Sequence, residues 1–189
     1  LVAPRDKPAP WATAGNAELQ TLLWDVGFQV GASMRPLAEL EKVLKEDFVT
    51  ATAVIEQRTL IADPALAGDL TALLDRFRAK RAREFLRYKL GELAQRRAAS
   101  GASVFLMEPN LKSNPGCLRD AQLLRTIAFV VAGGRNLLAL EDLEVVQRDD
   151  LQRAQVVNDH LLTLRSLLHF HHGRKQDVLA LQDQVRMAK

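Results

Sequence analysis

The chain has 189 residues, of which 48% are hydrophobic and 26% are charged, and its formal net charge is +3. This length allows one domain or two small ones, and the composition is ordinary for a globular protein. The charge is too small to indicate nucleic-acid binding, and no apolar run reaches the roughly 18 residues of a membrane span. We therefore expect neither nucleic acid nor a membrane as a partner. The single cysteine, Cys117, excludes an internal disulfide and fits a reducing, cytoplasmic location.

The first third of the chain contains one helical pattern followed by one strand pattern. Asn16 can cap a helix that runs to about Val26, and Gly27 can end it. Residues 28–34 alternate in part and predict a strand, which is unstable alone and needs a neighbour such as residues 1–2. The expected apolar face of the helix consists of Leu19, Leu22, Leu23 and Val26.

The rest of the chain is predicted to be helical. Pro36 suits the start of a helix, and Asp63 before Pro64 has the pattern of a helix cap and start. The run 76–97 is strongly basic but keeps apolar residues at helical spacing. A solvated helix face is its plainest interpretation, and contact with an acidic partner or with nucleotide phosphates is the alternative. The predicted helices cover residues 37–46, 47–60, 66–77, 76–97, 118–131, 141–147, 149–171 and 175–187, with a break at Ser100 and Gly101.

Residues 107–120 are the one stretch whose chemistry helix packing does not explain. Two prolines, a glycine and two asparagines rule out a helix there. Lys112 and Arg119 suit a phosphate, one as a point charge and the other as a planar fork. The helix that follows would add free backbone N–H groups at its start, which favour an anion. The alternative is a plain connector, with Arg119 and Asp120 used for capping and surface pairing.

The histidines do not indicate a metal site. His169 and His171 are two residues apart and do not share a helix face, and no Cys or acidic residue has ligand spacing. A cluster at a helix end, with one hydrogen-bonded core histidine, is the favoured interpretation. Cys117 lacks a local histidine partner as a nucleophile, and no serine-hydrolase or P-loop motif is present.

Three blocks of the chain resemble motifs of one family, the protein-PII uridylyltransferases. Residues 108–120 resemble its Glu-Pro-Asn-x-Lys-x-x-x-Gly-Gly-Leu-Arg-Asp signature. Residues 23–35 resemble its Leu-Trp-Asp-x-Gly-x-x-Val-Gly-His-Ser-x-Arg block, and residues 165–179 resemble its Arg-x-x-Leu-His…Gly-Arg-x-x-Asp-x-Leu block. Residues 47–62 fit between the blocks, which follow the family's order and span nearly the whole chain.

The chain departs from the family pattern at three points. Ala32 stands where the family usually has His, and Cys117 stands where it has a second Gly, which puts a side chain where backbone would approach a ligand. The family's catalytic motif, a Gly-rich turn followed by Ser-Asp-x-Asp, is not in this chain. We expect that motif just before Leu1. The resemblance then implies that this chain holds no catalytic residue and that Mg²⁺ is bound mainly by residues outside it.

The resemblance also implies a fold and a division into domains. The fold would be mainly α, a helical bundle with a small remnant of an α/β nucleotidyltransferase sheet near the N-terminus. Residues 1–62 would be the C-terminal part of the nucleotidyltransferase domain. Residues 63–189 would be a helical domain that carries the signature.

The implied activity is that of a bacterial enzyme of nitrogen regulation. It would transfer UMP from UTP to the PII signalling protein and, at full length, remove it, so PII and the nucleotide are the expected partners. Lys112 and Arg119 would neutralise the triphosphate, and Asp120 would orient Arg119. The further candidates are Arg35, which would reach the same cleft, and Glu108, Asn110, Gly116 and Asp47, of which Asp47 is explained at least as well as a helix N-cap.

Two alternatives to that enzyme are open. The chain could belong to a non-catalytic helical module that binds a nucleotide or a protein, and we expect the isolated segment to be inactive. A Gly-Ser-x-x-Asp-x-Asp motif just upstream of Leu1 would favour the enzyme, and a native start codon there would favour the module. A related transferase that acts on glutamine synthetase shares part of the signature, but the Leu-Trp-Asp and Glu-Pro-Asn blocks argue against it.

Overall fold

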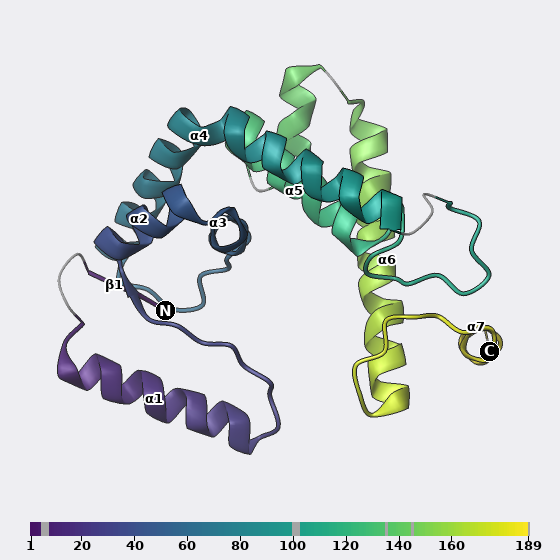
Figure 1. Cartoon of the computed structure of the whole chain (residues 1–189), viewed down its shortest axis with the longest axis horizontal. Coiled ribbons are helices and arrows are strands. Elements are labelled where there is room, and N and C mark those ends of the chain that lie inside the picture. The colour runs from purple at the N-terminus through teal and green to yellow at the C-terminus, as the bar shows by residue number, and fades with distance from the viewer. Residues whose placement is uncertain (5–7, 100–102, 135, 145, 189) are drawn as a thin grey trace. The chain divides into compact units, whose positions relative to one another are not determined.

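The computed structural model of the chain describes residues 1–4, 8–99, 103–134, 136–144 and 146–188. The chain divides into two compact units, Leu1–Arg81 and Ala82–Lys189. Helices dominate both units, and a two-stranded sheet lies near the N-terminus, which confirms the predicted mainly α fold (Figure 1). The boundary between the units falls within helix α4 (Pro64–Ala99). The domain boundary expected between residues 62 and 63 falls just before this helix and stays a prediction.

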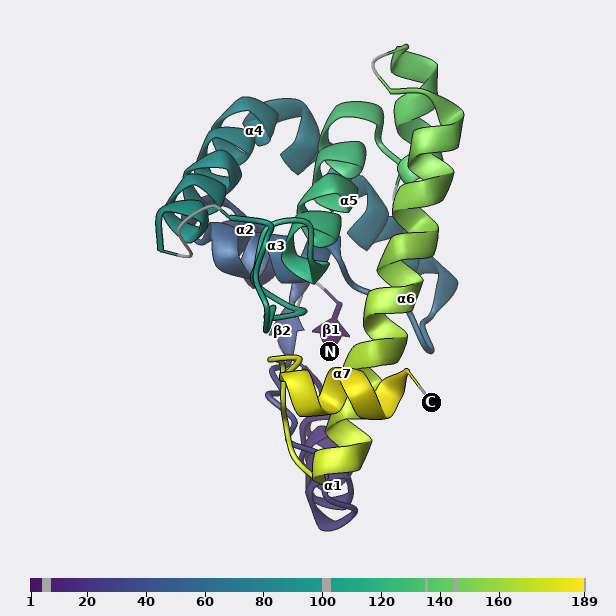
Figure 2. The same ribbon diagram turned by 90° about the vertical axis from the view of Figure 1, so that its right-hand side faces the viewer.

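The sheet of the first unit is smaller than the sequence pattern predicts. Strand β1 (Val2–Ala3) pairs in parallel with β2 (Arg35–Pro36), and the backbone N–H of Arg35 donates to the carbonyl of Leu1 at 3.1 Å (Figure 2). The N-terminal residues therefore pair in a sheet, but with residues 35–36 and not with the expected strand. The expected strand over residues 28–34 is wrong, because a strand persists only where a partner satisfies its backbone groups, and β1 is two residues long.

Helix α1 (Pro10–Asp25) begins earlier than the expected cap at Asn16. Proline suits a first helical turn because its missing N–H has no partner to lose there. Gly27 follows the helix end with a φ of 89°, as expected for a glycine stop. No residue of α1 is buried, and Leu22 and Val26 of its apolar face are 57% and 70% exposed. The described part of the first unit leaves this face uncovered.

The core of the first unit lies between α2 (Leu37–Glu46), α3 (Phe48–Ile55) and the start of α4. Helix α2 has the predicted bounds, whereas α3 ends at Ile55 instead of residue 60. Asp47 caps α3, because its carboxylate accepts hydrogen bonds from the N–H of Val49 at 2.9 Å and from the Thr50 hydroxyl. The buried residues of this core are Leu37, Leu40, Leu44, Ala51, Ile55, Leu70, Leu73, Leu74 and Phe77.

Helix α4 joins two helices that the sequence predicts separately. Asp63 caps it as expected, with hydrogen bonds from the N–H groups of Ala65 at 2.9 Å and Leu66 at 3.1 Å. Within its basic run, Lys89 pairs with Glu92 along the helix at 2.6 Å. The Lys89 side chain is only 12% exposed, so this pair does not by itself support a solvated helix face, and contact of the run with a partner stays a prediction. The expected break at residues 100–101 lies outside the described residues.

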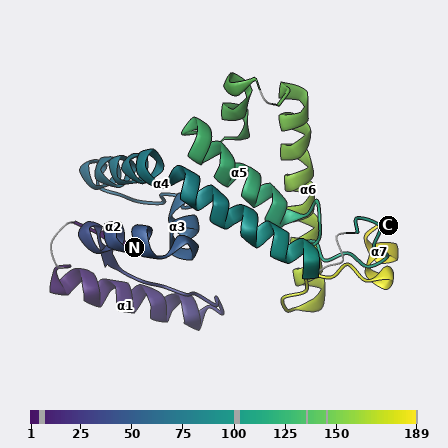
Figure 3. The same ribbon diagram turned by 45° about the horizontal axis from the view of Figure 1, so that its top comes forward.

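The second unit is built on α5 (Leu118–Ala132), the 3₁₀-helix η1 (Leu137–Leu143) and α6 (Arg148–His172). η1 connects α5 to α6 (Figure 3). A continuous core of Ala128, Leu137, Leu140 and Leu151 joins the three elements.

Two details of the second unit differ from the predictions. The short helix expected over residues 141–147 occurs earlier, because Asn136 caps η1 through the N–H of Leu138 at 3.1 Å. The sequence pattern predicts a buried face on α6 that consists of Leu151, Val156, Leu161, Leu164, Leu167 and Leu168. Leu151 and Leu168 are buried, but Val156 and Leu167 are 69% and 48% exposed. Helix α7 (Leu181–Met187) lies across the C-terminal end of α6 (Figure 2). Among the described residues, no helix combines the length and the apolar character that a membrane span needs.

A substitution at Gly134, between α5 and η1, tests how tightly the second unit is packed. A Cβ at this position would lie 2.4 Å from the Cβ of Ala139, which cannot move without moving backbone. We expect Gly134→Ala to destabilise this region by about 1–3 kcal/mol. Gly91→Ala is the matched control, because a Cβ there meets nothing within 4 Å and alanine favours a helix by up to about 1 kcal/mol. Hydrogen exchange should therefore speed up around η1 in the first variant, and equal exchange in both variants would contradict this packing.

Candidate anion-binding site

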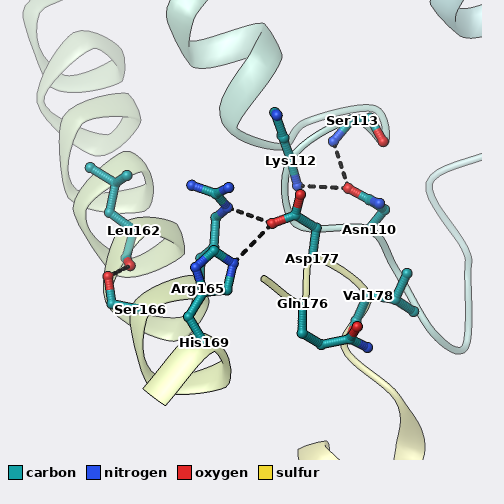
Figure 4. Close-up of polar contacts among 10 residues, drawn as sticks. All are labelled: Asn110, Lys112, Ser113, Leu162, Arg165, Ser166, His169, Gln176, Asp177 and Val178. Atoms are coloured by element: carbon teal, nitrogen blue, oxygen red, sulfur yellow. Dashed lines mark hydrogen bonds and ion pairs between the residues drawn. The ribbon is translucent and has the colours of Figure 1, made fainter. Parts of the chain in front are cut away.

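Residues 107–120, called the signature loop below, are held by their own polar side chains. The Oδ1 atom of Asn110 accepts hydrogen bonds from the N–H groups of Lys112 at 3.0 Å and Ser113 at 2.9 Å (Figure 4). Leu111 is buried beneath the loop, and Gly116 has a φ of 77°, which side chains rarely adopt. The Asn110 side chain and the Gly116 backbone conformation therefore shape the loop, and this shape fixes the backbone position of Lys112.

The signature loop is joined to residues 173–179, called the C-terminal segment. The N–H of Leu111 donates to the carbonyl of Asp177 at 2.8 Å, and the N–H of Leu179 donates to the carbonyl of Pro109 at 2.9 Å. Asn110 and Val178 form an antiparallel bridge between these bonds. Two of the three resembling blocks, far apart in sequence, thus lie side by side. Sequence reasoning missed this contact, because it depends on a long-range backbone pairing with no local pattern.

The start of α5 closes against the same loop. The N–H of Leu118 donates to the carbonyl of Leu111 at 3.1 Å, and the N–H of Arg119 donates to the carbonyl of Lys112 at 2.9 Å. The N–H of Asp120 is also bonded, to the carbonyl of Cys117 at 2.9 Å. The prediction of free helix N–H groups for an anion is therefore wrong. The same bonds make Lys112 and Arg119 neighbours, so these two side chains start from adjacent backbone positions.

Asp120 does not orient Arg119 as the sequence analysis expected. Its carboxylate pairs with Arg96 of α4 and accepts a hydrogen bond from the N–H of Gly116 at 2.9 Å. Arg96 approaches from another helix, which no local pattern could reveal. Arg119 is exposed and forms no ion pair within the described residues.

Cys117 stands where the resembling signature has a second glycine, and its side chain does not cover the solvent-facing side of the signature loop. Its side chain is buried at the start of α5, and burial raises the pKa of the thiol, with the nearby Asp120 carboxylate acting in the same direction. A thiol with a raised pKa is a poor nucleophile. The extra side chain is therefore accommodated inside the unit, on the side of the loop away from solvent.

Asp177 of the C-terminal segment binds two side chains of α6. Its Oδ1 atom accepts a hydrogen bond from Arg165 Nε at 2.7 Å and lies 3.1 Å from His169 Nε2 (Figure 4). Burial alone would raise the pKa of the Asp177 carboxyl, but the hydrogen bonds from Arg165 and His169 outweigh it and lower the pKa overall. Sequence analysis did not select these residues as site candidates. Their presence in the third resembling block was the signal that could have found them.

The side chains around Lys112 are mainly positive. Burial lowers the pKa of Lys112, and the nearby positive charges of Lys175, Arg119 and Arg165 lower it further, while the carboxylate of Asp177 acts in the opposite direction. Lys112 is half-buried and has no ion pair within the described residues. We call Lys112, Arg119, Arg165 and Lys175 the cationic cluster. Such a group of charges is stabilised by a bound anion.

This electrostatic arrangement predicts a pH dependence. A bound phosphate favours the ammonium form of Lys112 and so raises its lowered pKa. By linkage, phosphate affinity is full below the pKa of the unliganded Lys112 and falls as the pH rises through it. The loss should therefore begin at a lower pH than an ordinary lysine would give. Phosphate affinity measured from neutral to about pH 10 checks this. In Lys112→Arg the side chain stays charged, so phosphate affinity should change less with pH. If this variant shows the same pH dependence as the unsubstituted protein, a group other than Lys112 causes it.

The remaining predicted site residues have structural partners. Glu108 accepts a hydrogen bond from the N–H of Leu181 at 2.9 Å and so caps α7. Arg35 pairs with Glu39 at 2.9 Å, and Asp47 caps α3, where hydrogen bonds from Thr50 lower its pKa. Arg35 and Asp47 belong to the first unit, so their approach to the cationic cluster stays a prediction.

A second polar group joins α6 to α7. His171, His172 and the buried Asp183 place their ligand atoms within 4.8 Å of one another, as a metal site would require. Asp183 is eleven residues from His172, so the absence of local ligand spacing in the sequence did not reveal this acidic partner. However, His172 Nε2 already bonds to Asp183 at 3.1 Å, and the Arg186 guanidinium contacts the His171 ring. A guanidinium at this point opposes a metal cation, and the contacts account for the docking of α7 on α6.

Comparison with known proteins connects this geometry to one group of sequences. The family model described as GlnD PII-uridylyltransferase matches residues 84–189, which include the cationic cluster. No solved structure matches the chain.

Curated relatives match a larger part of the chain. A protein of Phenylobacterium zucineum named bifunctional uridylyltransferase/uridylyl-removing enzyme is 36% identical over 171 residues, covering 88% of this chain and 18% of the relative. Proteins with the same name from Caulobacter vibrioides and Cereibacter sphaeroides are 33% and 32% identical, over 97% and 96% of this chain and 20% of each relative. The chain thus spans about a fifth of the length of these relatives.

Proposed function

Because the chain belongs to the GlnD PII-uridylyltransferase family, we propose that it is part of an enzyme that transfers UMP from UTP to the PII signalling protein. The names of the relatives support uridylyl transfer and removal. PII as the acceptor, removal of UMP at full length, and a role in nitrogen regulation are parts of this proposal. A cytoplasmic location also belongs to it, because UTP is found there.

The proposed reaction is an in-line displacement at phosphorus. The oxygen of a tyrosine hydroxyl of PII forms a bond to the α-phosphorus of UTP, and the bond from that phosphorus to the α,β-bridging oxygen breaks. The electron pair leaves with pyrophosphate, and the hydroxyl proton passes to solvent. Negative charge grows on the leaving group, so fixed positive charges beside it stabilise the transition state.

The observation that supports this role is the unpaired charge of two members of the cationic cluster. Lys112 and Arg119 lie on neighbouring, hydrogen-bonded positions and have no ion pair within the described residues. They would contact the triphosphate. The cluster does not fit Mg²⁺, which prefers free carboxylate oxygens, because Asp120 is paired with Arg96 and Asp177 with Arg165. Mg²⁺ would be held outside this chain, and the isolated chain would be inactive.

The test is uridylylation of PII by the full-length protein, with labelled UTP, Mg²⁺ and ATP as the competing nucleotide. We expect label on PII from UTP, and a KM for UTP raised roughly tenfold in Arg119→Ala, which loses a charged hydrogen-bond donor. Arg153→Ala is the control, since its side chain is 78% exposed on α6 outside the cluster. Nucleotide binding without transfer would favour the non-catalytic module instead. Transfer from UTP by the isolated 189-residue chain would contradict its predicted inactivity.

A further inference from the structure

Two basic residues outside the signature loop belong to the same charged group as Lys112. The backbone bonds between Leu111 and Asp177 and between Leu179 and Pro109 fix the C-terminal segment against the loop. Lys175 lies in this segment, and its charge acts on the Lys112 ammonium. The exposed side chain of Lys175 has no ion pair within the described residues.

Arg165 is held by one edge of its guanidinium. Its Nε atom donates to Asp177 at 2.7 Å (Figure 4), while its two terminal nitrogens make no hydrogen bond within the described residues. His169 shares the same Asp177 oxygen at 3.1 Å. Asp177 therefore fixes the direction of Arg165 and leaves the terminal nitrogens able to donate. This is the part of arginine that suits two phosphate oxygens at once.

The charge of the cluster indicates the size of its anion. The charges that act on Lys112 are those of Arg119, Arg165, Lys175 and the Asp177 carboxylate, so the four positive charges of the cluster less one negative charge leave an excess of three. A single phosphate group carries roughly 1.5–2 negative charges at neutral pH, and two linked groups carry about three, because the bridging oxygen is not ionisable. Two linked phosphates balance the cluster better than one.

We propose that Arg165 and Lys175 complete a subsite for two linked phosphates, and that Asp177 and His169 position Arg165 in it. The ligand class is pyrophosphate, free or as the β,γ-phosphates of a nucleoside triphosphate. This rests on the proposed function and adds to Lys112 and Arg119 a second pair of anion-binding residues from α6 and the C-terminal segment. The subsite would hold the leaving group while the α-phosphate is transferred.

The affinity of the full-length protein for pyrophosphate, by calorimetry and by product inhibition, tests the subsite. We expect Arg165→Ala and Lys175→Ala each to weaken pyrophosphate binding by roughly 10- to 100-fold, with a smaller loss for inorganic phosphate. Arg165→Lys keeps the charge but not the fork and should fall between. Arg174→Ala is the matched control, an exposed neighbour of Lys175, and should bind as the unsubstituted protein does.

Substitutions of Asp177 show whether this residue acts by holding Arg165 in place or only by its negative charge. Removing its negative charge in Asp177→Ala should tighten anion binding if charge alone matters. If Asp177 holds Arg165 in place, the same variant binds pyrophosphate more weakly, and Asp177→Asn, which keeps an acceptor for Arg165 Nε, recovers part of the loss. Tighter binding by Asp177→Ala would overturn the positioning role.

The outcomes also separate this subsite from the proposed function. Unchanged pyrophosphate affinity in both Arg165→Lys and Lys175→Ala overturns the subsite. If Arg119→Ala still raises the KM for UTP in that case, uridylyl transfer stands without it. If PII receives no label from UTP but the pyrophosphate losses occur, the subsite stands and the transferase assignment fails.

Discussion

Replacing Lys112 with alanine should weaken UTP binding to the full-length protein and lower kcat/KM for uridylylation by roughly 30- to 100-fold. Lys112 is half-buried among like charges, with burial as the largest cause of its lowered pKa. A bound phosphate relieves this repulsion and forms a charged hydrogen bond worth about 2–3 kcal/mol, and each 1.4 kcal/mol is about tenfold in affinity. Equilibrium binding of UTP and steady-state kinetics measure the loss.

Two further variants show whether the effect of Lys112→Ala comes from the charge at this position. Lys112→Arg should keep a substantial part of the affinity, because the charge stays while the geometry changes. Lys45→Ala removes an exposed lysine that pairs with Glu41 on α2 at 3.1 Å, and should leave UTP affinity unchanged. Unchanged UTP affinity in Lys112→Ala would remove Lys112 from the nucleotide site.

Leu151→Ala should be the most damaging of the single substitutions considered for stability. Leu151 is 1% exposed and lies in the core that joins α5, η1 and α6. Truncating a buried leucine costs about 2–5 kcal/mol, from lost burial and from the cavity left behind. Hydrogen exchange of the full-length protein should therefore accelerate in peptides from η1 and the start of α6.

Val156→Ala is the control for Leu151→Ala, on the same helix. Val156 is exposed, so its truncation should change local stability by no more than about 0.5 kcal/mol. Equal acceleration in the two variants would show that α6 does not pack through Leu151. Loss of the core should also disturb the cationic cluster, because Arg165 belongs to the same helix.

Elements with strong local signals were predictable from the sequence. Pro36 before an amphipathic run gave α2 with its bounds, and Asp63 before Pro64 gave the start of α4. The helix predicted over residues 118–131 matches α5, and Gly133 after it takes the left-handed conformation that ends a helix. Each of these features depends on residues within a few positions of one another, so a sequence pattern contains the whole cause.

Features that depend on distant partners were missed. Residues 28–34 have a strand pattern, but within the described part of the first unit only Arg35–Pro36 pairs with another strand. Helix α6 has more apolar residues than the neighbouring elements of the second unit can cover, so Val156 stays exposed. The local patterns around these residues specify their secondary structure or polarity but not what covers them.

The candidate site shows the same division. Lys112 and Arg119 were predicted from charge and loop composition, and the structure makes them neighbours through a backbone hydrogen bond. The role of Asp120 was mistaken because Arg96, a distant residue of α4, takes its carboxylate. Arg165 and Asp177 were not selected because their relation to the loop arises from pairing between residues 109–111 and 177–179.

The most direct measurement is the affinity of the full-length protein for UTP and for uridine, before and after the combined Lys112→Ala and Arg165→Ala substitutions. If these side chains bind the phosphates, UTP affinity falls by at least about 100-fold, because two charged contacts are lost. Uridine, which has no phosphate, should bind both proteins equally. An equal loss for both ligands, or no loss for UTP, would contradict a phosphate role for the cationic cluster.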